Sequence, residues 1–389
     1  YGAETLMSLD DDSIPTSDVI EGAKHPSEAL AVIGHQNAED SFVDAINKGR
    51  LHHAWMITGP KGIGKATFAW RIAKYLLCSP IKEEGASLFG DTPGVIETLD
   101  IDPHHPVLRR IQAGSEGRLS IVRRPLDAKR KLFKAQITIE EIRKLKSFFA
   151  LSAADGGRRV VIIDAADDMN VNAANALLKV LEEPPQHTIL LLISHQPSRL
   201  LPTIRSRCRT LRLGALSQVD IDAILATQEL EIDAAEMGAL STLSAGSAGE
   251  AMRLAQHNGP AVYHQILGLI AQAPKIDRPS AIKFSEQYTA RTSSEDLDIL
   301  GLMFDRVLSR LAVFGATGNT PAELVHSGEV EIFSKLCPTP QSAQDWAELC
   351  QELSNRFQHG RTVNLDPVAL VLDMIFKIEH CAKRAQGLT

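Results

Sequence analysis

The stretch AWMITGPKGIGKAT, residues 54–67, decides how we interpret this chain. Its first five residues are apolar or β-branched, which is typical of a short buried strand. The spacing G-x-x-x-x-G-K follows, and apolar residues then recur at helical intervals as far as Leu77. Such a loop presents successive backbone N–H groups to phosphate oxygens, and the next helix adds the positive end of its dipole. We expect phosphate-binding positions at Gly59, Pro60, Lys61, Gly62, Ile63, Gly64, Lys65, Ala66 and Thr67. The alternative is a glycine-rich strand-to-helix turn that holds no ligand.

Three more segments have the pattern of strands, and helical segments alternate with them. Strands that are apolar throughout and alternate with helices indicate a parallel sheet covered on both faces. The predicted strands are 160–163, 188–194 and 209–213, and the predicted helices are 37–48, 66–77, 139–149 and 172–183. The sequence therefore predicts an α/β domain around the phosphate loop.

Strand signals vanish after Gly214, and the rest of the chain has helical periodicity. The last helix is the best marked, with Asp366 as its N-cap and Pro367 at its first position. We therefore expect an α/β plus all-α architecture in four parts: an acidic tail at 1–27, an α/β domain at 28–213 with a basic insert at about 80–134, a small helical domain at 214–260, and a larger helical domain at 261–389.

Composition excludes several classes of protein. A length of 389 residues suggests two or three domains, and 44% hydrophobic with 23% charged residues is ordinary for a globular chain. The net charge of −7 argues against a surface that is basic all over, and 5% aromatic residues argue against a surface built on base stacking. No apolar run approaches the roughly 18 residues of a membrane span. We expect a cytoplasmic protein with no membrane partner.

The cysteines predict neither a disulfide framework nor a metal site. A structural zinc site needs four ligands, usually in close pairs, and Cys-x-x-Cys spacing does not occur in this chain. We expect free thiols, as in a reducing cytosol. The five residues are Cys78, Cys208, Cys337, Cys350 and Cys381.

Two side chains that an ATP-hydrolysing phosphate loop needs are missing from this chain. The hydroxyl that ligates magnesium would come from the place of Ala66, and Thr67 is one residue late, about 100° away around a helix. Asp164 ends its strand where a metal-directing carboxylate belongs, but the next residue is Ala165 instead of a water-activating Glu. Asp167 and Asp168 have the pattern of solvated helix-start residues. We expect no hydrolysis and no required cofactor, with weak binding of ATP or ADP by Lys65 and the backbone.

Three further motifs resemble a known family. LHHAW at 51–55, NALLKVLEEPP at 175–185 and TIRSRC at 203–208 resemble the clamp-loader branch of the AAA+ ATPases. The resemblance covers about residues 28–260, and the last helical region matches only in size and period. It implies an AAA+ phosphate-loop domain, a small helical lid domain and a C-terminal helical collar domain.

The resemblance also implies roles for single residues. Arg207, in the Ser-Arg-Cys motif, matches the arginine that reaches into the ATP site of an adjacent motor subunit. Ser194 matches a sensor residue that contacts the third phosphate of ATP; the alternative is a residue that only ends its strand. Gly249 stands where motor subunits carry a sensor arginine. The family thus implies a subunit that does not turn over ATP itself. The residue pattern alone favours a solvated arginine at a strand end, and the preceding Glu-Glu-Pro-Pro block at 182–185 turns the preference to the role in an adjacent ATP site.

The implied function is that of a non-motor subunit of the bacterial replicative clamp loader, part of the DNA polymerase III holoenzyme, in which any polymerase activity belongs to the complex. The implied partners are the gamma/tau motor subunits and the delta subunit, with the sliding clamp and primer-template DNA reached through the complex. The alternatives are an autonomous AAA+ ATPase and a scaffold without nucleotide or arginine chemistry. For the basic insert we favour a solvated hairpin over a DNA contact.

Overall fold

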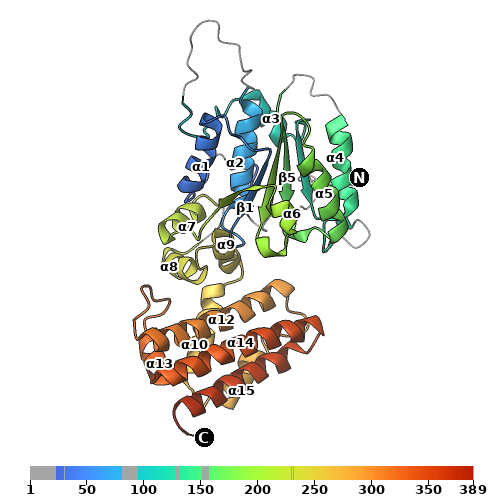
Figure 1. The fold of residues 1–389 in the computed structure, drawn as a ribbon. Helices are drawn as coiled ribbons and strands as arrows, with labels where there is room; N and C mark the ends of the chain where they lie inside the picture. The colour runs from blue at the N-terminus through green and yellow to red at the C-terminus, as the bar shows by residue number, and fades with distance from the viewer. Residues whose placement is uncertain are drawn as a thin grey trace, which may run out of the picture. The chain divides into compact units, whose positions relative to one another are not determined.

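The computed structural model describes residues 23–29, 31–80, 95–127, 132–150, 157–228, 230 and 232–388. The chain divides into two compact units, residues 1–216 and 217–389, which are described separately below (Figure 1). The predicted acidic tail lies almost wholly outside the described residues. The predicted separation of a lid at 214–260 from a collar at 261–389 stays a prediction.

The first unit is built on a five-stranded parallel sheet with the order β2-β5-β6-β1-β7. Its strands are β1 (Ala54–Thr58), β2 (Leu119–Arg123), β5 (Arg159–Asp164), β6 (Thr188–Ser194) and β7 (Arg209–Arg212). Each neighbouring pair is parallel, so all five carboxyl ends lie at one edge of the sheet. The predicted parallel sheet is confirmed.

Helices cover both faces of this sheet (Figure 1). Because successive strand residues point to opposite faces, Trp55 and Ile57 pack with α1, α2 and α3, whereas Ala54 and Met56 pack with α4, α5 and α6. The two sets of buried residues form two hydrophobic cores, one on each face. The helices are α1 (Gln36–Asn47), α2 (Lys65–Cys78), α3 (Pro106–Gln112), α4 (Ile139–Ala150), α5 (Val171–Glu182) and α6 (Pro202–Arg205).

The basic insert contributes more to the fold than a solvated hairpin. Residues 81–94 and 128–131 lie outside the described residues, and β3 (Leu126–Asp127) and β4 (Leu132–Phe133) do form a short antiparallel pair. The insert also supplies α3 and the edge strand β2, which the sequence analysis missed. Two of its arginines are structural: Arg110 and Arg118 each place Nε 2.9 Å from the carboxylate of Glu116, whose side chain is buried.

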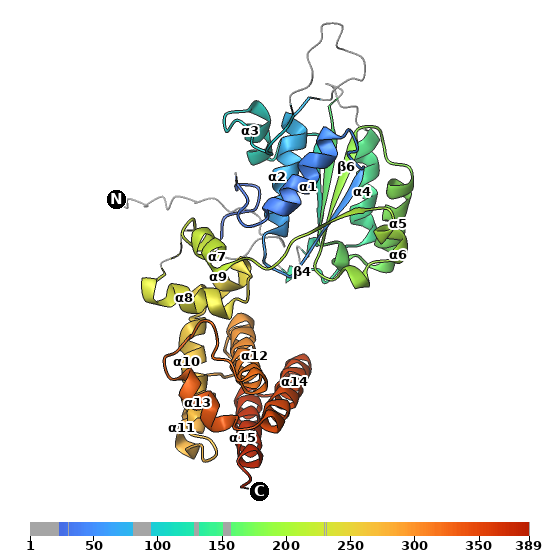
Figure 2. The same cartoon turned by 60° about the vertical axis from the view of Figure 1, so that its left-hand side comes forward.

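The second unit is entirely helical in its described residues. The long helices α12, α14 and α15 lie side by side, α14 packing against both of the others (Figure 2). The last helix begins as predicted, because the Asp366 side chain accepts a hydrogen bond from the Ala369 N–H at 3.0 Å and Pro367 is the first helical residue. The helices are α7 (Gln218–Leu225), α8 (Ala234–Leu243), α9 (Ala248–Gln256), α10 (Gly259–Ala271), α11 (Arg278–Ser285), α12 (Ser294–Thr317), α13 (Glu329–Leu336), α14 (Pro340–Thr362) and α15 (Pro367–Ala385).

A buried carboxylate joins three helices of this unit. Glu329, at the start of α13, is fully buried and accepts hydrogen bonds from Tyr263 on α10 at 2.5 Å and from Arg310 on α12 at 2.7 Å. The ion pair with Arg310 compensates for removing the charge from water.

In the described part of the chain, no helix combines the length and the apolar character that crossing a membrane requires.

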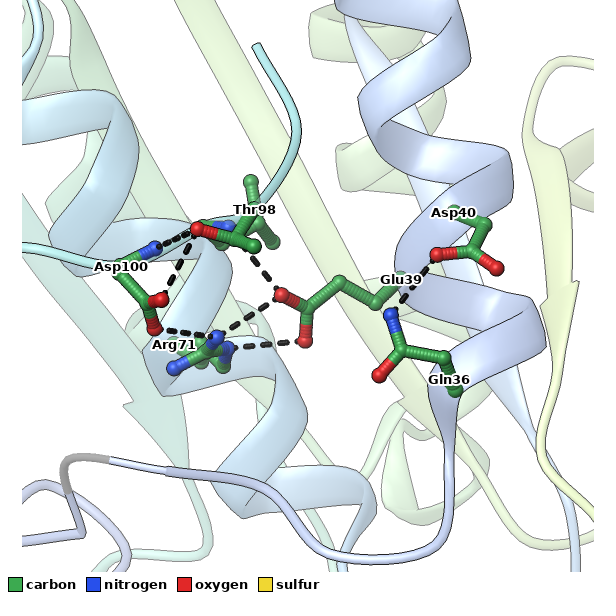
Figure 3. Close-up of polar contacts among 7 residues, drawn as sticks. Gln36, Glu39, Asp40, Arg71, Thr98 and Asp100 are labelled. Carbon is green, nitrogen blue, oxygen red and sulfur yellow. Dashed lines mark hydrogen bonds and ion pairs between the residues drawn. The ribbon is translucent and has the colours of Figure 1, made fainter.

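A second buried ion pair holds the helices on one face of the sheet. Glu39 on α1 accepts two hydrogen bonds from Arg71 on α2, at 2.9 and 2.8 Å, and a third from the Leu99 N–H at 3.1 Å (Figure 3). The Glu39 and Arg71 side chains are only 7% and 9% exposed. Arg71 also reaches Asp100 at 3.0 Å. The pair therefore ties α1, α2 and the segment before α3 together.

We expect Arg71→Met to destabilise the first unit by about 3 kcal/mol or more, because Glu39 would then be a buried charge without its partner. Calorimetric unfolding of the full chain measures this loss. Lys48→Met is the matched control: it breaks the exposed Asp44–Lys48 pair, whose side chains are 51% and 60% exposed. The control should cost no more than about 0.5 kcal/mol. Equal losses in the two variants would contradict the role of the buried pair.

Candidate functional site

The loop between β1 and α2 is a tight turn that depends on two glycines. Gly59 has a φ of +150°, and a Cβ there would come within 2.4 Å of the Leu213 carbonyl oxygen and 2.6 Å of Ile63 Cδ1. Gly64 caps α2 in the left-handed region at a φ of +94°. Both positions therefore require glycine. The predicted order of strand, loop and helix is confirmed at the predicted residues.

The lysine of the loop is folded back onto the loop itself. Lys65 is buried, and its Nζ donates hydrogen bonds to the carbonyl oxygens of Gly59, at 2.8 Å, and of Pro60. Burial lowers the pKa of the ammonium group to about 8, and the negative charges of Asp164 and Asp167 limit that fall. Lys65 is thus an ammonium group close to losing its proton.

A histidine that the sequence analysis missed forms a hydrogen bond with the loop. His35 directly precedes α1 and is buried, and its Nε2 donates to the Ile63 carbonyl at 2.6 Å. This contact spans 28 residues. A lone histidine before a helix has no pattern that indicates such a contact, so only the fold reveals it.

The structure places the two residues predicted to lack catalytic groups at the start of α2 and directly after β5. Ala66 is the second residue of α2, directly after Lys65, and Ala165 directly follows the end of β5 and is buried. A methyl group at either place offers neither a metal ligand nor a base. Within the described residues, no group of three His, Cys, Asp or Glu side chains could hold a metal ion. In the second unit, the blank Gly249 is a buried residue in the first turn of α9.

Ser194 is bound to a carboxylate of the same chain. It ends β6 and pairs in register with Thr58, the last residue of β1. Its Oγ donates to Asp167 Oδ1 at 2.6 Å, and Asp167 Oδ2 accepts from the backbone N–H groups of His195 and of Gln196, the latter at 3.0 Å. The polar groups at the end of β6 therefore converge on Asp167.

Asp167 and Asp168 do lie at the start of a short helix, as expected, but they are half-buried and paired instead of solvated. Asp167 accepts the three hydrogen bonds just described, and Asp168 forms an ion pair with Arg124 at 3.3 Å. Both lie in the short 3₁₀ turn Ala166–Asp168 after β5. Since β5 and β6 are parallel neighbours, this turn lies beside the end of β6. The sequence analysis could not place it there, because it could not order the strands.

His195 is a further group at this edge that the sequence analysis missed. Its Nδ1 is shielded from solvent and forms no hydrogen bond with any described residue. Burial and the positive charge of Lys65 lower the pKa of the ring to about 4, so it is neutral at physiological pH. The edge thus combines a cationic lysine, a neutral histidine and the Asp167 carboxylate.

Arg207 lies on the surface, away from this edge. It follows α6 and precedes β7, and its side chain is 36% exposed. Its guanidinium donates to the Thr203 carbonyl at 3.0 Å and lies 2.9 Å from a carboxylate oxygen of Glu182, the last residue of α5. This ion pair therefore joins the motif at 175–185 to the motif at 203–208.

Comparison with known proteins agrees with the motifs. A family model described as "DNA polymerase III, delta subunit" matches residues 34–217. Over 156 residues the chain is 42% identical to DNA polymerase III subunit delta' of Pseudomonas aeruginosa, covering 40% of this chain and 41% of that protein. Over 210 residues it is 34% identical to subunit delta' of Bacillus subtilis, covering 54% and 56%. Subunit tau of Escherichia coli is 29% identical over 234 residues, covering 59% and 32%. The chain thus spans about half the length of these relatives, or less.

Two solved structures from Thermotoga maritima are distant matches. A DNA polymerase III gamma subunit-related protein has a TM-score of 0.41 at 16% identity and covers 88% of this chain and 99% of its own. The RuvB Holliday junction branch migration motor has a TM-score of 0.38 at 15% identity, covering 74% and 79%. Scores this low carry no argument. Residues 34–217 match the family model, and the matching regions of the two delta' subunits are 42% and 34% identical to this chain, so this part of the chain is similar to DNA polymerase III subunit delta'.

Proposed function

We propose that this chain is a non-motor subunit of the bacterial replicative clamp loader and supplies Arg207 to the ATP site of a neighbouring motor subunit. The observation that carries the proposal is the position of Arg207 relative to the chain's own phosphate loop. The loop follows the carboxyl end of β1, whereas Arg207 precedes the amino end of β7, and the two strands are parallel neighbours. Arg207 and the loop therefore lie at opposite edges of the sheet.

The length of β7 sets the distance between Arg207 and the phosphate loop, and this distance is too great for Arg207 to act on a nucleotide in its own loop. Four strand residues at about 3.3 Å each separate the two edges by roughly 13 Å, so Arg207 has no access to phosphates held by its own loop. A guanidinium at the surface can instead meet a phosphate bound by another subunit. In the best-studied phosphate-loop enzymes, an arginine supplied in trans raises the rate by about 10³ to 10⁵.

The contact with Glu182 does not prevent such a role. The Arg207 and Glu182 side chains are 36% and 50% exposed, and an ion pair this exposed contributes at most about 1 kcal/mol. A guanidinium can exchange a surface carboxylate for a bidentate phosphate contact, which is stronger. Glu182 would hold Arg207 near its working position until the neighbouring subunit arrives.

The proposed partners follow from the family. The matches to gamma/tau chains support a complex with such motor subunits. The delta subunit is proposed as a further partner from the family resemblance alone. This complex would open the sliding clamp and place it on primer-template DNA during DNA replication. Polymerase activity would belong to the holoenzyme and not to this chain. The helices of 261–389 are the proposed means of assembly.

An autonomous ATPase is the second candidate, favoured by the well-formed loop and its lysine. Ala66, Ala165 and Gly249 oppose it, because three groups that hydrolysis needs are missing. Weak binding of ATP or ADP without turnover is the outcome that the loop supports.

Arg207→Ala should leave the complex assembled and lower its DNA-stimulated ATP hydrolysis by about 10³ or more at the site that it serves. Arg207→Lys should restore little activity, since a lysine lacks the planar fork of donors. Arg205→Ala, an exposed arginine two residues earlier, is the matched control and should keep full turnover. Unchanged ATPase in an assembled Arg207→Ala complex would rule out the trans role.

The purified chain should bind ADP or ATP weakly and should not hydrolyse ATP when magnesium is added. Lys65→Ala should remove the binding, because it deletes the cation of the loop. Calorimetry measures the binding, and a phosphate-release assay measures hydrolysis. Magnesium-dependent hydrolysis that disappears in Lys65→Ala would establish the autonomous ATPase instead.

Nucleotide affinity should fall as the pH rises through about 8, the pKa of Lys65. Phosphate favours the protonated lysine, so the attraction is complete below that pKa and is lost above it. From pH 7 to pH 9 the protonated fraction of a group with this pKa drops about tenfold, and the affinity should drop with it. Lys65→Arg, which stays charged, should give a flat profile. A flat profile for the unaltered chain would show that its Lys65 is not near its pKa.

A further inference from the structure

The end of β6 forms a binding site for a pair of negatively charged oxygens. The Ser194 hydroxyl and the backbone N–H groups of His195 and Gln196 all donate to the carboxylate of Asp167. Two successive backbone N–H groups that point at one anion form a concavity of the kind that binds phosphate. Here a side chain of the same protein fills the concavity.

This concavity adjoins the phosphate loop. Ser194 pairs with Thr58, and Thr58 directly precedes Gly59, the first residue of the loop. The charge of Asp167 acts on Lys65, and the charge of Lys65 acts on His195, so these groups share one electrostatic environment. Ligands of open parallel sheets bind at the carboxyl ends of the strands, and the loop lysine reaches the outermost phosphates. The Asp167 carboxylate therefore lies at the same edge of the sheet as the loop, close enough for its charge to act on the loop lysine.

We propose that Asp167 is a specificity-determining residue that makes the loop select a nucleoside diphosphate over a triphosphate. This inference rests on the proposed nucleotide binding by the loop. The donors that a third phosphate would need are already bound to Asp167, and the carboxylate repels the additional negative charge. Neither Ala66 nor Ala165 can help to hold a magnesium ion that would offset this repulsion. A diphosphate avoids both costs.

Dissociation constants of ADP and ATP for the full-length chain test the proposal by calorimetry. The unaltered chain should bind ADP about tenfold or more tightly than ATP, because like charges brought together discriminate strongly. Asp167→Asn removes the charge and keeps the shape, and it should bring the ratio to about threefold or less. Asp168→Asn is the matched control, since Asp168 is the next residue and pairs with Arg124 instead. It should keep the ratio of the unaltered chain.

Three results would overturn the proposal: equal affinities for ADP and ATP in the unaltered chain, an unchanged ratio in folded Asp167→Asn, or no binding of either nucleotide to any variant. If circular dichroism shows that Asp167→Asn does not fold, the unaltered chain is tested instead, by measuring how well inorganic polyphosphates displace a fluorescent ADP from it. Pyrophosphate should then compete about tenfold better than tripolyphosphate, and equal competition would refute the selection. The ATPase of the complex with and without Arg207 is a separate measurement, so the trans role can fail or hold independently.

Discussion

The parallel register of β1 with its two neighbours is the constraint on which the rest of the first unit depends. It pairs Thr58 with Ser194 on one side and with Arg212 on the other. The phosphate loop, the end of β6 and the turn after β5 therefore share one edge of the sheet. The same register forces Gly59 against the Leu213 carbonyl, where only glycine fits. One set of backbone hydrogen bonds thus positions the loop and the groups that face it.

Parallel strands also separate the two chemical sites. Groups after the strands meet at the loop edge, and groups before them meet at the opposite edge, where Arg207 lies beside Glu182. One edge has a phosphate loop without the groups for hydrolysis, and the other has an exposed guanidinium. This separation is the basis of the proposal that Arg207 acts on another subunit and not on the chain's own loop.

Burial distinguishes the ion pairs that fix the fold from those that can exchange. Glu39 and Arg71 are shielded from water and hold α1 against α2, so breaking that pair leaves a costly unpaired charge. Arg207 and Glu182 are solvated, so their separation costs little. Asp167 lies between these extremes: its carboxylate fixes the end of β6, yet it does so with groups that could also bind a phosphate.

Local pattern was enough to predict the elements that carry strong periodicity. Predicted and observed bounds agree within a residue or two for the strands β1, β5 and β6, for the helices next to them and for the capped start of α15. A fully buried strand is apolar throughout and a helix cap has a preferred residue type, so both can be recognised from local sequence. The edge strand β2 was missed because only one of its five residues is fully buried. The partners of His35, Asp167 and Ser194 lie 27 to 29 residues away in the sequence. Sequence alone therefore determined that a glycine-rich loop with a lysine joins a buried strand to a helix, and that Ala66 follows this lysine. Only the strand order decided which side chains lie beside the loop, since hydrogen bonding between distant strands has no counterpart in local spacing.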